Sequence, residues 1–219
     1  MREIMTVLNK ESASVIKQEE TIKNTEYGVV KRVSTNDIPV IDISRYLSGE
    51  GIEEVALQIL DAVTHKGFFY VSNHGIPKEI IDTASKGMRD FFDKAAEVKN
   101  EAPVNTSQRG WLGPGMATLK GAKTHDLKEI FFWGPERWTD ALNQKRHELP
   151  LIADNVWPDK QSPELKKTLL PYYDQACDVG HKILAAISLA LGLQEDFFAK
   201  RYETPMARGQ LVYYPVSTD

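Results

Sequence analysis

Cysteine, long apolar runs and an excess of charge of one sign are all scarce or missing in this 219-residue sequence. The one cysteine, Cys177, cannot form an internal disulfide, which excludes a disulfide-stapled framework. It lies in an apolar helical pattern, so we interpret it as a core residue rather than a nucleophile. No apolar run approaches the roughly 20 residues of a membrane-spanning helix, and the N-terminus lacks the apolar core of a signal peptide. We therefore expect a cytoplasmic protein with no membrane partner.

The charge balance argues against a nucleic-acid partner. The formal net charge is −4, from 27 Lys and Arg against 31 Asp and Glu, and both signs are interspersed along the chain. A nucleic-acid-binding domain usually carries a clustered basic face, which this sequence does not offer.

Recognisable catalytic motifs are also missing. The sequence has no glycine-rich phosphate loop, no His-Glu-x-x-His pair and no Gly-x-Ser-x-Gly elbow. No histidine is followed two residues later by Asp or Glu, so the local half of a two-histidine, one-carboxylate iron site is absent. The histidines are His65, His74, His125, His147 and His181. We therefore predict no catalytic residue and no metal ligand in the chain itself.

The stretch from Gly67 to Pro77 is the clearest structural signal. Its aromatic, apolar run at 68–71 predicts a buried strand, and Asn73 and Gly75 suit the sharp turn that follows. Pro77 then suits the first turn of a helix. We interpret His74 as a turn residue that satisfies local backbone groups, because no second ligand lies at metal spacing.

The remaining segments indicate an α+β chain of one domain. Residues 1–37 are polar and predict a poorly ordered arm. The spacing of apolar residues predicts helices over 51–66 and 80–92. Gly67 suits the C-terminal cap of the first helix. We expect both helices to pack on the same sheet. Strands are expected at 38–43, 125–132 and 210–215.

A long helix is expected from Ser162-Pro163 to Gly192, with Ser162 as a hydroxyl cap. Pro171 interrupts its apolar stripe and predicts a kink or two shorter helices. Another short helix is expected at 194–202.

Two side chains are candidates for binding. Arg109, beside Gly110 and Trp111 in a long glycine-rich loop, has a guanidinium that suits a carboxylate; a solvated loop arginine is the more common alternative. Tyr213 and Tyr214 lie on a predicted strand, where alternation sends one ring inward and the other outward. One hydroxyl is therefore placed to hold a ligand, although a packed aromatic is again the more common outcome.

Five motifs in series resemble one family. They are Ile38-Pro-Val-Ile-Asp-Ile-Ser44, Gly67-Phe-Phe-Tyr-Val-Ser-Asn-His-Gly-Ile76, Arg109-Gly-Trp111, Asp126-Leu-Lys-Glu-Ile-Phe131 and Leu211-Val-Tyr-Tyr-Pro215. Together they resemble the N-terminal portion of the isopenicillin-N-synthase-like branch of the 2-oxoglutarate- and iron(II)-dependent oxygenases. The resemblance covers Ile38 to Pro215.

The resemblance implies a helical, mixed α/β region wrapped on a double-stranded β-helix, or jelly roll, that carries the iron. It implies an oxidoreductase using iron(II), 2-oxoglutarate and O2 on a small organic substrate, by hydroxylation, desaturation or ring closure. Some members of the branch do without 2-oxoglutarate. The family's His-x-Asp pair, distal histidine and Arg-x-Ser follow the Tyr-Tyr-Pro strand, and this sequence stops before them.

We therefore expect a truncated jelly roll with four parts: an arm (1–37), the N-terminal dioxygenase region (38–160), a long helical segment packing on the jelly roll (161–209), and the first part of the jelly roll (210–219). The last strand is expected to find all its neighbours downstream. An unpaired edge and apolar face would then make the isolated chain poorly soluble or partly folded.

By resemblance, Tyr214 matches the tyrosine that contacts co-substrate or substrate, and Arg109 lies where several members reach toward the substrate. Asp126, Lys128 and Glu129 are interpreted as structural charges. Two alternatives stay open: a truncated, non-catalytic relative that serves as a binding module, and an unrelated α+β domain with chance motifs. The latter predicts that 38–43 and 68–71 do not share a sheet.

Overall fold

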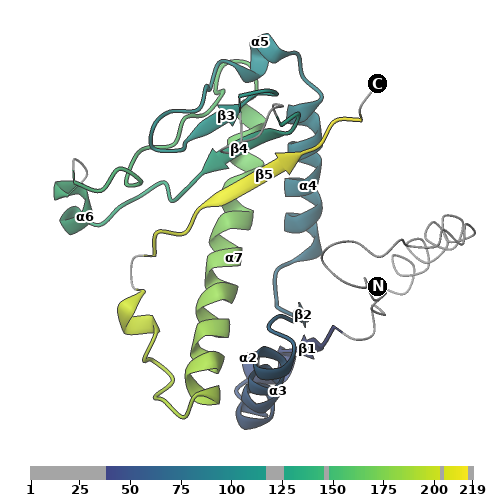
Figure 1. The fold of residues 1–219 in the computed structure, drawn as a ribbon, viewed down its shortest axis with the longest axis vertical. Helices are drawn as coiled ribbons and strands as arrows, with labels where there is room; N and C mark the ends of the chain where they lie inside the picture. Colours follow the sequence, from purple (N-terminus) through teal and green to yellow (C-terminus); the bar gives the residue numbers. More distant parts are fainter. Residues whose placement is uncertain (1–37, 117–125, 146–147, 203–204, 217–219) are drawn as a thin grey trace, which may run out of the picture. The chain divides into compact units, whose positions relative to one another are not determined.

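A computed structural model describes residues 38–116, 126–145, 148–202 and 205–216 (Figure 1). The chain divides into two units, Met1–Ile38 and Pro39–Asp219, and the elements below belong to the second. The arm predicted for 1–37 lies outside the described residues. The described part combines helices with two sheets, which confirms the mixed α/β character. No helix in these ranges is both long and apolar enough to span a bilayer.

The first sheet pairs two short strands in parallel, with Ile41 beside Val71. Two helices connect the strands, and Val55 and Ile59 of the longer one pack against Ile41. The elements are β1 (Val40–Asp42), α2 (Ser44–Leu47), α3 (Ile52–His65) and β2 (Tyr70–Ser72). The segments 38–43 and 68–71 therefore meet in one sheet, and the chance-motif alternative is wrong.

The predicted buried strand at 68–71 is more exposed than expected. Phe68 is 60% exposed and Tyr70 is 59% exposed. A two-stranded sheet covered by helices on one face leaves alternate side chains on the other face in solvent. The turn that follows agrees with its sequence, since Asn73 (φ 51°) and Gly75 (φ 84°) both have left-handed backbones.

The second sheet is antiparallel, in the order β3-β4-β5. Its strands are β3 (Gly110–Leu112), β4 (Glu129–Trp133) and β5 (Gly209–Tyr213). All five residues of β5 pair with β4, from Gly209 beside Trp133 to Tyr213 beside Glu129. The expectation that the last strand finds all its neighbours downstream is therefore wrong, because its first partner lies earlier in the chain.

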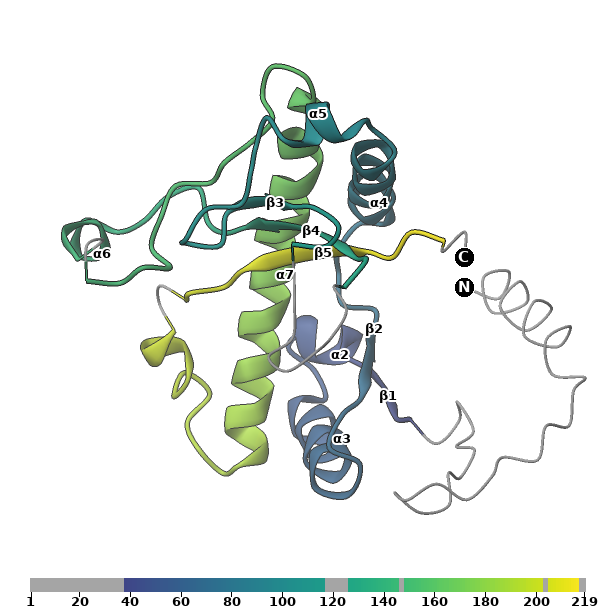
Figure 2. The same ribbon diagram turned by 45° about the horizontal axis from the view of Figure 1, so that its top comes forward.

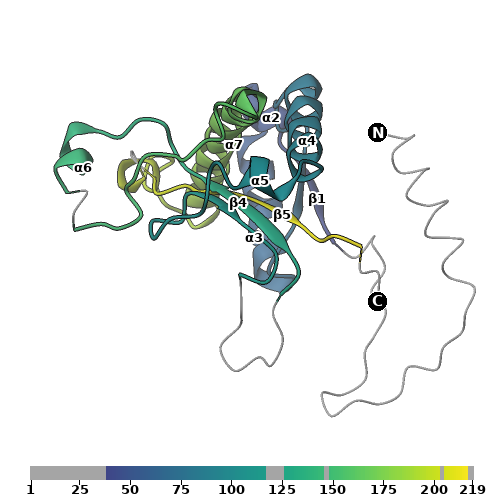
Figure 3. The same ribbon diagram turned by 90° about the horizontal axis from the view of Figure 1, so that it is seen from above.

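Two long helices lie against one side of the second sheet (Figure 3). They are α4 (Lys78–Phe92) and α7 (Pro163–Ala190); the shorter helices are α5 (Ala96–Lys99), α6 (Asp140–Gln144) and η2 (Ala199–Arg201). Helix α7 contacts α4 and also α3, so it runs past both sheets (Figure 2). The expectation that α3 and α4 pack on the same sheet is wrong, since α3 packs on β1 and α4 packs on the second sheet.

Helix α7 is continuous through Pro171, so the alternative of two shorter helices is wrong. Ser162 is its N-cap residue, as predicted, but the hydroxyl makes no capping hydrogen bond. The helix expected at 194–202 is reduced to the single 3-10 turn of η2.

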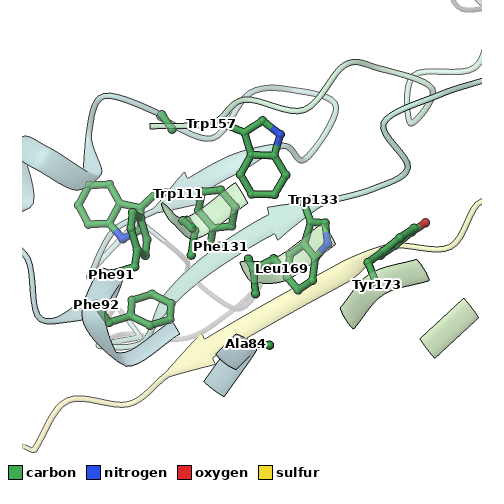
Figure 4. Close-up of a cluster of buried hydrophobic side chains, with 11 residues drawn as sticks. Ala84, Phe91, Phe92, Trp111, Phe131, Trp133, Trp157, Leu169 and Tyr173 are labelled. Carbon is green, nitrogen blue, oxygen red and sulfur yellow. The ribbon is translucent and has the colours of Figure 1, made fainter. Parts of the chain in front are cut away.

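Aromatic rings fill the space between the second sheet and these helices (Figure 4). Phe131 of β4 is fully buried, with its ring centroid 5.2 Å from that of Phe91 and 5.4 Å from that of Trp157. Tyr213 stacks on Phe92 at 5.2 Å. The core thus fixes the side of the sheet that faces the two helices.

Candidate functional site

The second sheet has a helix-facing side and a side directed away from α4 and α7, which we call the distal face. Side chains alternate along each strand, and the helix-facing set contains Trp111, Phe131 and Leu211. The residues between them in the register form the distal face: Gly110, Leu112, Ile130, Phe132, Gln210 and Val212. Ile130 and Phe132 are 5% and 9% exposed, so the centre of this face is apolar and is also shielded from solvent.

Tyr214 follows the last residue of β5 and has the same parity as Gln210 and Val212. It is 70% exposed, whereas Tyr213 is 36% exposed and stacks on Phe92, a residue of the helix-facing core. The alternation predicted for this tyrosine pair is therefore confirmed, and Tyr214 is the ring left available for a ligand.

Lys128 is the charged neighbour of Tyr214. Its ammonium lies 2.6 Å from the Asp126 carboxylate. The hydrogen bond from Lys128 lowers the pKa of Asp126, and the same bond, with a smaller contribution from Tyr214, raises the pKa of Lys128. These charges pair with each other, in agreement with their structural interpretation.

Arg109 is 2% exposed, so the solvated-arginine alternative is wrong. Its Nη1 donates to the carbonyl oxygens of Ser107 and Gln108, both at 3.1 Å, and its Nη2 donates to that of Leu151 at 2.8 Å. The guanidinium lies so close to Gly134 that a Cβ there would be 2.6 Å from Nη2. Its Nε is buried and has no hydrogen-bond partner.

Burial lowers the pKa of Arg109, and the positive charge of Arg208 lowers it further. Neutral carbonyl acceptors hold the guanidinium in place without cancelling its charge. The Arg109 loop itself needs Gly110, which has φ +101° and would place a Cβ 2.6 Å from the carbonyl oxygen of Ala102.

The sheet does not bring the two predicted site residues together. Arg109 adjoins Gly110, which is in register with Phe132 and through it with Gln210, while Tyr214 follows Tyr213 at the other end of β5. Gln210 and Tyr213 are roughly 10 Å apart along the strand, at about 3.4 Å per residue. Arg109 and Tyr214 lie beyond these two points, so they mark separate subsites.

Sequence reasoning missed Arg208 and Gln210. Both line an open cavity of about 330 Å³ at the Arg109 end of the sheet. The guanidinium carbon of Arg208 lies 5.3 Å from the Phe132 ring centroid, over the distal face. Side chains in a strand alternate between its two faces, so positions 208, 210 and 212 are expected on the same side as Tyr214. This alternation could have identified Arg208 and Gln210 from the sequence.

A larger cavity, of about 630 Å³, lies between α7 and β5 and has mainly apolar walls. Cys177 lines it, and burial raises the pKa of the thiol. A protonated thiol is a poor nucleophile, which supports the interpretation of Cys177 as a core residue.

His74 also agrees with its interpretation as a turn residue, because its Nδ1 accepts a hydrogen bond from the Ile76 backbone N–H at 3.1 Å. His125 and His147 lie outside the described residues.

Comparison with known proteins decides the family. The family described as non-haem dioxygenase in morphine synthesis N-terminal matches residues 38–160, which is more than half of the chain. The chain belongs to the 2-oxoglutarate- and iron(II)-dependent oxygenase family. The resemblance read from its five motifs is confirmed.

Similar oxygenases come from several organisms. A 2-oxoglutarate-Fe(II) type oxidoreductase, ppzC, of Metarhizium rileyi is 30% identical over 85% of this chain and 53% of its own length. A 1-aminocyclopropane-1-carboxylate oxidase of Dictyostelium mucoroides is 29% identical over 84% of this chain and 50% of its own length. The crystal structure of a putative 2OG-Fe(II) oxygenase family protein from Caulobacter crescentus is 28% identical, with a TM-score of 0.71 over 83% of this chain and 57% of that chain.

The chain spans about half the length of the curated relatives it matches. Iron(II) and 2-oxoglutarate are the cofactors named for this oxygenase family. Within residues 38–116, 126–145, 148–202 and 205–216, no three His, Cys, Asp or Glu side chains gather as metal ligands would. The described residues therefore do not fit an iron centre.

Proposed function

We propose that this chain is the N-terminal part of an oxygenase that uses iron(II), 2-oxoglutarate and O2 to oxidise a small organic substrate by hydroxylation, desaturation or ring closure. Its parts are an arm (1–37), the N-terminal dioxygenase region (38–160), a helical segment packing on the jelly roll (161–209) and the start of that jelly roll (210–219). The observation that carries the proposal is the likeness to the Caulobacter crescentus oxygenase over 83% of this chain.

The end of β5 supports the proposal in a second way. Tyr214 stands exposed there, with Lys128 as its charged neighbour. In this arrangement Tyr214 contacts the co-substrate or the substrate through its hydroxyl, and Arg109 contributes a positive charge from the opposite end.

Anaerobic titration with Fe(II) and 2-oxoglutarate tests the proposed cofactors. We expect the metal-to-ligand charge-transfer band when the chain is extended with any sequence encoded downstream, and no band from the 219 residues alone. A band from the 219 residues alone would show that they hold an iron site, and its absence from both proteins would overturn the proposed function.

Replacing Tyr214 with phenylalanine tests the subsite at the end of β5. In the extended protein we expect the Kd of 2-oxoglutarate or of the substrate to rise roughly tenfold, because one hydrogen bond to a charged group is lost. The charge-transfer titration measures the first Kd, and calorimetry measures the second. Tyr213→Phe is the matched control, since that ring packs on Phe92 and both constants should stay unchanged. Equal effects of the two substitutions on both constants would exclude the assigned role of Tyr214.

A further inference from the structure

The cavity at the Arg109 end of the sheet has the features of an anion site. It is lined by Arg109, Trp138, Leu151, Met206, Arg208 and Gln210, all of them described residues. Arg109 is buried, and three carbonyl oxygens take hydrogen bonds from its Nη1 and Nη2. A guanidinium has five N–H donors, so the Nε–H and one N–H of Nη2 remain after these bonds.

The uncompensated charge of Arg109 is the decisive observation. Its guanidinium is buried among neutral carbonyl oxygens, and within the described residues no carboxylate forms an ion pair with it. A buried charge without a counter-charge destabilises the fold. An anion in the adjoining cavity would offset that cost.

Two like charges face the same space. Arg208 and Arg109 line one cavity, and the charge of Arg208 bears on Arg109. Like charges at a shared site repel each other, and an anion between them converts that repulsion into attraction. Arg208 is held over the Phe132 ring, and Gln210 adds an amide that donates hydrogen bonds.

The rest of the lining is apolar. Trp138 is 9% exposed, with its Nε1 donating to the Ala153 carbonyl oxygen at 3.3 Å, so its ring presents carbon atoms rather than a free donor. Met206 adds a flexible apolar side chain. A ligand here would need a compact anionic group and a flat or apolar body.

We propose that this cavity binds the carboxylate of a small substrate with an aromatic or aliphatic body, through Arg208 and Gln210 and beside the buried charge of Arg109. The planar fork of arginine matches a carboxylate better than it matches a neutral amide. The inference rests on the proposed function only in naming the ligand a substrate. The site is separate from Tyr214, which lies at the other end of β5.

Benzoate and its neutral isostere benzamide form a matched pair of probes. The complete protein is titrated with each by calorimetry in EDTA, so that neither iron nor turnover is needed. We expect benzoate to bind at least tenfold more tightly than benzamide, with an affinity that falls as salt is added. Equal affinities for the two probes would overturn the proposal.

Arg208→Gln is the informative variant, because Arg208 is exposed and makes no backbone contact that holds the loop, whereas Arg109 holds three carbonyls. We expect Arg208→Gln to raise the Kd of benzoate roughly tenfold and to leave that of benzamide unchanged. Arg89→Gln, the same change on the exposed face of α4, should leave both constants unchanged. A normal benzoate Kd in Arg208→Gln, or an equal loss in Arg89→Gln, would place the anion elsewhere.

The two proposals fail separately. Benzoate binding without a charge-transfer band would leave the anion site standing and remove the oxygenase assignment. A normal band with no preference for benzoate would leave the oxygenase assignment and remove the anion site.

Discussion

Replacing Lys99 with methionine is expected to destabilise the fold by about 3–5 kcal/mol, because it leaves a buried carboxylate unpaired. Lys99 and Glu129 are 5% and 6% exposed, and the Lys99 ammonium lies 2.7 Å from Glu129 Oε2. A carboxylate this far from water cannot recover the lost attraction by hydration. Methionine keeps the unbranched apolar stem of the side chain and is only one heavy atom shorter, so the effect comes mainly from the lost ammonium.

The ion pair also connects several elements. Lys99, at the end of α5, donates to the Phe92 carbonyl oxygen at 2.9 Å, and Trp111 of β3 donates to Glu129 of β4 at 2.8 Å. The ammonium lies 5.4 Å from the Trp111 ring centroid, within the range of a cation–π contact. Losing Lys99 therefore weakens the attachment of α5 and of the β3–β4 pair to the helices.

Urea unfolding followed by tryptophan fluorescence measures this effect. Lys128→Met is the matched control, since the Lys128–Asp126 pair has a similar 2.6 Å separation but side chains that are 23% and 30% exposed. We expect less than about 1 kcal/mol from that change. The double variant Lys99→Met with Glu129→Gln should recover part of the lost stability. Equal losses in the two single variants would show that burial does not set the strength of the Lys99 pair.

Short-range patterns predict the elements of this fold well. Apolar and β-branched runs located strands at 38–43, 125–132 and 210–215, close to β1, β4 and β5. Which strands pair, and which helix packs on which sheet, depends on contacts between segments far apart in sequence. No local pattern records such contacts. The pairing of β5 with β4, and the packing of α3 and α4 on different sheets, could only come from the structure.

At the candidate site, too, local features could be predicted from the sequence and long-range contacts could not. Alternation along β5 correctly separated Tyr213 from Tyr214, because side-chain direction in a strand is a local property. The environment of Arg109 is not local: one of its acceptors is the Leu151 carbonyl oxygen, 42 residues away, and its cavity includes Met206 and Arg208. A loop arginine beside Gly110 therefore looked solvated in sequence and is buried in the structure.

Replacing Phe131 with alanine is expected to cost about 3–5 kcal/mol, the usual effect of removing a fully buried phenylalanine. Its ring is enclosed by Phe91, Trp157 and Trp133, at centroid distances of 5.2, 5.4 and 6.5 Å. These neighbours come from a helix, a loop and the same strand, so they cannot all move inward to fill the cavity. The loss should therefore lie near the upper end of that range.

Leu127→Ala removes a comparable apolar side chain that is 56% exposed, and less than about 1 kcal/mol is expected from it in the same urea experiment. Phe131 faces the helices, while its neighbours Ile130 and Phe132 lie on the distal face. If the helix-facing core fixes the position of β4, Phe131→Ala should weaken benzoate binding as well as stability, although Phe131 does not line the anion cavity. Unchanged stability would mean that the aromatic cluster does not hold the sheet. Reduced stability with unchanged benzoate affinity would mean that the cavity keeps its shape independently of that core.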